Sequence, residues 1–163
     1  MNRNQTFTAM IIAAGRKYLT TGLFICTVLL PGISVHAQDA ETLATRYLEK
    51  YKNHITDAAL QRKLNQSPPE QIVEAFIPYV EDSLPEIRSV ARYQISQAGL
   101  RSDSEKTRKK AITAILKGLD DKDASSVAQS IDLLQDFKPS DFTPEDRYVI
   151  AQKAKQALFS TIS

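Results

Sequence analysis

Few residues in this chain have a type and spacing suited to catalysis or metal binding. It contains two histidines and one cysteine, and Cys26 and His36 both lie near the N-terminus. His54 then stands alone, whereas a zinc site needs three or four ligands. Serine is plentiful, but no Gly-x-Ser-x-Gly elbow and no glycine-rich phosphate loop accompanies it. We therefore expect no enzyme activity, no bound metal and no cofactor.

One acidic segment copies the ligand spacing of a calcium-binding loop. Asp121, Asp123 and Ser125 alternate, and Asp132 occupies the twelfth place. Ser126, however, stands where such a loop requires glycine, and Asp132 replaces the usual bidentate glutamate. We interpret the segment as a polar turn in which Asp123 caps the helix that follows.

The chain has one dense basic run, in which Asp103 and Glu105 are interspersed. Its cations are Arg101, Lys106, Arg108, Lys109 and Lys110. Such a run could contact a phosphate backbone or a membrane surface. We interpret it instead as the solvated face of a helix, so no nucleic-acid partner is expected and a DNA-binding helical-repeat enzyme is the least favoured function.

Residues 1–37 have the composition of a secretory signal peptide. They contain no acidic residue, carry three basic ones, and include an apolar stretch, Leu23–Leu30, well short of the ~20 residues of a membrane span. We predict cleavage after Ala37 and export to the periplasm or the medium. The alternatives are an uncleaved N-terminal membrane anchor and a true start at Met10. Cleavage would leave 18 basic and 19 acidic residues, a net charge of −1 that gives no general attraction to nucleic acid.

The remaining sequence predicts an all-α domain. Apolar residues recur at spacings of three and four, and Gly99 and Gly118 are the only glycines after residue 37. Seven helices are expected, at 40–52, 57–64, 68–80, 84–98, 103–119, 124–137 and 144–159. Four Ser/Thr-x-x-Glu/Asp patterns, starting at Ser67, Ser83, Ser102 and Thr143, predict N-terminal capping boxes.

An apolar pattern that ends in two acidic residues occurs twice, 39 positions apart. The first copy is Ile72, Val73, Phe76, Ile77, Val80, Glu81, Asp82, and the second is Ala111, Ile112, Ile115, Leu116, Leu119, Asp120, Asp121. A helix-length pattern that returns after one helix pair is typical of stacked helical hairpins.

The residues around the first copy resemble the HEAT repeat, an armadillo-like helical repeat. An apolar first helix ends in an acid, Asp82, and a basic residue, Arg88, follows six positions later. The resemblance implies a right-handed α-α superhelix in which Asp82 and Arg88 are structural. It divides the chain into N-terminal capping helices at 38–66 and HEAT-like repeats at 67–163, the last of them partial. In the second copy Val127 stands where the base is expected.

These observations together predict an exported, non-enzymatic module that binds a protein partner or acts as a scaffold. In such stacks the second helix of each hairpin usually faces the partner, and Tyr and Arg are favoured at interfaces. The candidate contact residues are Arg92, Tyr93, Gln97, Gln129 and Asp132. The alternative is an accessory or inhibitory subunit of a larger exported enzyme, which docks through the edge of an incomplete stack.

Overall fold

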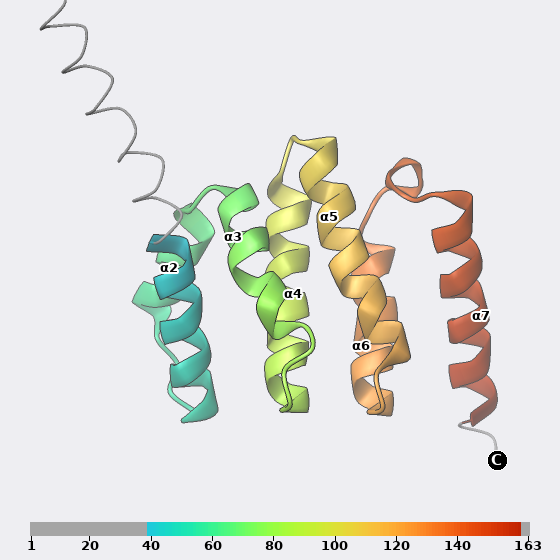
Figure 1. The fold of residues 1–163 in the computed structure, drawn as a ribbon, viewed down its shortest axis with the longest axis horizontal. Coiled ribbons are helices and arrows are strands. Elements are labelled where there is room, and N and C mark those ends of the chain that lie inside the picture. The colour runs from blue at the N-terminus through green and yellow to red at the C-terminus, as the bar shows by residue number, and fades with distance from the viewer. Residues whose placement is uncertain (1–38, 161–163) are drawn as a thin grey trace, which may run out of the picture. The chain divides into compact units, whose positions relative to one another are not determined.

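The computed structural model describes residues 39–160, and within this range it contains helices and no β-strand (Figure 1). The predicted all-α class is confirmed. A helix covers 39–52, and six further α-helices follow: α2 (Ala58–Gln66), α3 (Pro69–Phe76), α4 (Pro85–Arg101), α5 (Glu105–Leu116), α6 (Ala124–Gln135) and α7 (Pro144–Ser160). The predicted signal peptide lies outside the described residues. No helix in 39–160 has the length and apolar character needed to cross a membrane.

Two of the predicted helices change from α to 3-10 geometry before they end. α3 continues as η1 (Ile77–Tyr79), and α5 continues as η2 (Lys117–Asp120). Pro78 has no N–H with which to extend the α-helical hydrogen bonds, and Gly118 is a poor helix former. A third 3-10 turn, η3 (Pro139–Asp141), joins α6 to α7.

One of the four predicted capping boxes is confirmed. The N–H of Asp146 donates to Thr143 Oγ1 at 3.1 Å, and the N–H of Thr143 donates to Asp146 Oδ2 at 2.9 Å. The reciprocal pair satisfies two N–H groups that the first turn of α7 would otherwise leave without acceptors.

The other three predicted boxes are wrong, because their serines have other partners. The hydroxyl of Ser67 donates to the carbonyl of Lys63 at the end of α2, and that of Ser102 donates to Glu70 Oε1, at 2.8 and 2.9 Å. Near Ser83, the carboxylate of Asp82 accepts the N–H of Leu84 at 2.9 Å, and no side chain caps the first turn of α4.

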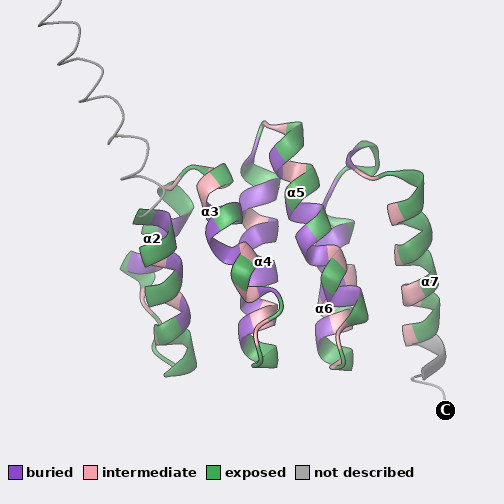
Figure 2. Ribbon diagram, viewed as in Figure 1, coloured by how far each residue is buried: buried purple, intermediate pink, exposed green. Residues whose placement is uncertain are grey.

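The core lies where α4 packs against α3, α5 and α6, and α3 also contacts α5. Phe76, Ile95 and Ile115 are completely buried there. α6 in turn contacts α7, which is the most exposed of these helices (Figure 2). The buried faces of consecutive helices thus form one continuous apolar core that thins towards α7.

The two copies of the repeated pattern have matching burial. Ile72, Val73, Phe76 and Val80 are buried, as are their four counterparts, whereas Ile77 and Leu116 are half-buried and Glu81 and Asp120 are exposed. The helices keep the same spacing: α4 and α6 begin at Pro85 and Ala124, and α5 and α7 begin at Glu105 and Pro144, each pair 39 positions apart.

Candidate functional site

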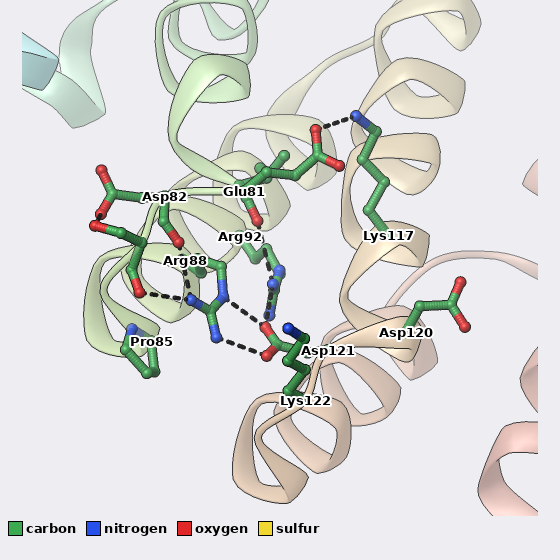
Figure 3. Close-up of a pocket in the computed structure, with 11 residues that line it drawn as sticks. Glu81, Asp82, Pro85, Arg88, Arg92, Lys117, Asp120, Asp121 and Lys122 are labelled. Carbon is green, nitrogen blue, oxygen red and sulfur yellow. Dashed lines mark hydrogen bonds and ion pairs between the residues drawn. The ribbon is translucent and has the colours of Figure 1, made fainter.

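The most concentrated charge cluster in the described residues centres on the carboxylate of Asp121. Arg88 approaches it with one edge of its guanidinium, Nε donating to Oδ2 at 2.8 Å and Nη2 to Oδ1 at 2.6 Å. Nη2 of Arg92 donates to Oδ2 at 2.6 Å (Figure 3). Two-point pairing of arginine with a carboxylate is among the stronger polar contacts in proteins.

The helix positions explain how these side chains meet. Arg88 and Arg92 lie one turn apart on α4, so both point from the same face, and Asp121 follows directly after η2. Nη1 of Arg88 also donates to the main-chain carbonyl of Asp82 at 2.8 Å. Arg88 therefore joins the α3–α4 turn to the α5–α6 turn. It contacts Asp82 through the main-chain carbonyl and not through the carboxylate.

The charges of this cluster are buried, so each of them is costly to leave without a partner. The side chains of Arg92 and Asp121 are each 2% exposed, and Nε and Nη1 of Arg92 are buried without a hydrogen-bond partner in the structure. The hydrogen bond from Arg88 lowers the pKa of Asp121 far below its usual value, against the opposing effect of burial, and Arg92 adds to the lowering. Removing one charge of such a cluster leaves the others buried without compensation.

A second arginine makes the same kind of contact at the opposite ends of the helices. Nη1 of Arg108 donates to the carbonyl of Ser102 at 3.0 Å, and Nε donates to Asp141 Oδ1 at 3.0 Å. Arg88 and Arg108 thus each bind the carbonyl six residues before them and the carboxylate 33 residues after them. We call these two contact sets, Arg88–Asp121 and Arg108–Asp141, the arginine bridges.

Exposed lysines join the first helices of successive hairpins. Lys110 of α5 pairs with Glu74 of α3, and Lys117 of η2 pairs with Glu81, just after η1, at 2.8 Å. Lys153 of α7 pairs with Asp120 at 2.7 Å. Because these groups are solvated, each pair adds little stability. In all three pairs, however, the lysine comes later in the sequence than its acidic partner.

The five predicted contact residues differ in their exposure, and Arg92 differs most from the other four. Tyr93 is 44% exposed and Asp132 is exposed, while Gln97 is half-buried. Gln129 is half-buried, with Oε1 buried and lacking a hydrogen-bond partner in the structure.

The expectation that Arg92 lies on an exposed binding surface is wrong, because it is 1% exposed. Its guanidinium packs against Gly118, where an added Cβ would come within 2.8 Å of Arg92 Cζ. The glycine provides the room in which the side chain turns inward to Asp121. From the sequence, Gly118 indicated only helix content, and this role was not predicted.

The cluster borders an open pocket of about 450 Å³, whose lining includes Lys117, Lys122, Glu81 and Asp120. Both signs of charge line it, and the carboxylate of Asp121 is already occupied by two arginines. Asp123 accepts the N–H of Ser126 at 3.0 Å, so its predicted role as the cap of α6 is confirmed. In the part of the chain that the structure describes, no three His, Cys, Asp or Glu side chains gather as a metal site would require. The arrangement fits a structural cross-link.

Comparison with known proteins adds no relative. A scan against protein-family models found no match, and neither curated proteins nor solved structures showed a significant similarity. The functional proposal therefore depends on the sequence and the geometry of this chain alone.

Proposed function

We propose that this chain is a non-enzymatic helical-repeat module that binds a protein partner. Its hairpins would stack as a short right-handed α-α superhelix of the HEAT type, with residues 39–66 covering one end. The observation that carries this proposal is the pair of arginine bridges, because two contacts of identical sequence spacing join one inter-helix turn to the next turn at the same end of the helices. Repetition of a contact along the chain is what a stacked repeat requires.

The proposed binding surface lies on the row formed by α4 and α6, which contact each other. Tyr93 and Gln97 lie one turn apart on α4, and Asp132 is exposed on α6. A solvated tyrosine beside polar side chains has the composition of an interface anchor with a polar rim. Nothing in this surface provides a nucleophile with an adjacent base, so the proposed activity is binding.

We place this activity outside the cytoplasm, in the periplasm or the medium, on the composition of residues 1–37. The near-neutral charge that remains after the predicted cleavage favours a protein partner over nucleic acid.

Affinity capture of the processed chain from its native compartment tests the proposal. Tyr93→Ala should reduce recovery of the partner at least tenfold. Tyr51→Ala is the matched control, because Tyr51 is 41% exposed on the helix 39–52, and should leave recovery unchanged. Equal recovery with both variants would contradict the assignment of the α4–α6 surface.

A second candidate, an accessory or inhibitory subunit of a larger exported enzyme, is supported by the exposure of α7. Tyr148 and Val149 on this helix are 66% and 42% exposed. This candidate predicts that adding the purified chain changes the rate of an enzyme that it captures. An unchanged rate at saturation would favour the simple binding module.

A further inference from the structure

A third arginine occupies the position of the two that form the arginine bridges. Arg88, Arg108 and Arg147 are each the fourth residue of their helix, in α4, α5 and α7. Arg108 and Arg147 are 39 positions apart, the spacing at which α5 and α7 begin. Arg147 is exposed, and its recorded contact is a 3.4 Å hydrogen bond from Nε to the carbonyl of Thr143. Among residues 39–160, no carboxylate forms an ion pair with it.

Arg147 lies at the edge of an apolar groove of about 320 Å³ between α6 and α7. Apolar side chains make up most of the lining, including Leu134, Phe137, Phe142 and Ile150. The neighbouring carboxylate, Asp146, is engaged by the N–H of Thr143. The groove therefore combines apolar surface with a cation that has not been matched by an acid of the described chain.

The equivalent place between α4 and α5 shows what such a groove holds. Ile95 and Ala111, which correspond to Leu134 and Ile150, are completely buried there. The ring of Phe137, just after the end of α6, lies so close to Gly99 that a Cβ there would be 3.1 Å from its Cζ. Four residues later, Asp141 pairs with Arg108. An aromatic residue at a helix end and a following aspartate thus fill the first groove.

We propose that the α6–α7 groove binds a second protein through a segment of this same chemistry. The segment would place a large apolar side chain at the end of a helix against Phe142 and Ile150. A carboxylate about one helical turn later would accept hydrogen bonds from Arg147. Charge complementarity with Arg147 selects an acidic segment over a basic one. This surface belongs to α6 and α7, so it can fail or succeed independently of the Tyr93 surface.

The chain itself supplies a suitable probe, a labelled synthetic peptide of residues 124–143, which contains Phe137 and Asp141. Fluorescence polarisation with the processed full chain should show saturable binding. Replacing Phe137 by Ala or Asp141 by Asn in the peptide should weaken binding at least tenfold. Absence of saturable binding at millimolar protein would overturn the proposal.

Protein variants locate the bound peptide. Arg147→Glu should weaken binding at least tenfold, and a peptide with Asp141→Lys should recover part of the loss. Arg62→Glu, an exposed arginine on α2, is the control and should bind as the unmodified chain does. Circular dichroism verifies that both variants remain folded.

Two results would overturn the proposal even if the peptide binds. Loss of binding in Arg108→Ala but not in Arg147→Glu would show that the peptide displaces α6 from its own groove. Self-association of the chain in sedimentation experiments, abolished by Arg147→Glu, would assign the groove to a second copy and not to a different protein.

Discussion

α5 and α7 begin at equivalent positions of the sequence pattern but have very different surroundings. In α5, Ala111 and Ile115 are completely buried and Arg108 is paired with Asp141. In α7, their counterparts Ile150 and Ala154 are only half-buried. α5 packs against α3, α4 and α6, whereas α7 packs mainly against α6. The comparison teaches that the neighbours of a helix decide how much of its apolar face is buried.

The difference in stability effect between α5 and α7 should be largest when a core side chain is truncated. Ile115→Ala in α5 is expected to lower the free energy of unfolding by about 4 kcal/mol, since it opens a cavity in a closed core. Ile150→Ala in α7 should cost about 1 kcal/mol, because part of that side chain already contacts water. Urea denaturation measures both. Equal losses would show that α7 is packed as tightly as α5.

The Arg88–Asp121 bridge gives the next largest effect. Asp121→Asn should cost about 3 kcal/mol at neutral pH, since Arg92 then loses its charged partner while buried. The depressed pKa of Asp121 means that the bridge stabilises the fold above the unfolded-state pKa of about 3.9 and is lost as the pH falls below it.

The pH dependence provides the control for this prediction. The difference in unfolding free energy between the unmodified chain and Asp121→Asn should shrink steadily below about pH 4. A difference that stayed constant from pH 7 to pH 3 would show that the variant acts through packing and not through the charge.

Gly118 and its counterpart Ala157 offer a smaller test of the same comparison. A Cβ at Gly118 would approach Ser130 Oγ to 2.1 Å and Arg92 Nε to 2.8 Å, so neighbours must shift. Gly118→Ala should therefore destabilise the chain by about 2 kcal/mol, while α7 already carries an alanine at the equivalent position. Thermal unfolding measures the effect, and a gain in stability would show that the guanidinium of Arg92 can move aside freely.

The smallest effect concerns the turn after the helix 39–52. His54 has a positive φ of 55°, and the N–H of Ile55 donates to the carbonyl of Lys50 at 2.9 Å, as in a glycine-ended helix. His54→Gly should raise the unfolding free energy by about 0.5–1 kcal/mol, because glycine adopts this conformation without strain. A loss of stability in thermal unfolding would mean that the imidazole makes a stabilising contact.

The sequence predicted the helices and the buried positions of the repeated pattern because both depend on local spacing. Phe76 and Ile115 were assigned to equivalent buried positions from their intervals alone, and both are completely buried. The capping boxes were less predictable, since a hydroxyl such as that of Ser102 is drawn to a carboxylate, Glu70, on another helix. Local pattern cannot show that competition.

The arginine bridges could not be derived from local spacing either. Arg88 reaches its carboxylate 33 residues away, and the inward turn of Arg92 depends on the missing Cβ of Gly118 on a different element. One sequence pattern could have indicated the arginine bridges. Arginine recurs at the fourth residue of three helices, Arg88, Arg108 and Arg147, and an acid follows the first two at equal distances.

The two arginine bridges lie at opposite ends of the helices, one at the α3–α4 and α5–α6 turns and the other at the α4–α5 and α6–α7 turns. The turns at either end of these helices therefore cannot move apart without separating a guanidinium from its carboxylate. The segment from α3 to α6 should therefore move as one rigid body in solution. A partner that docks on it would lose little entropy to ordering this side of the interface.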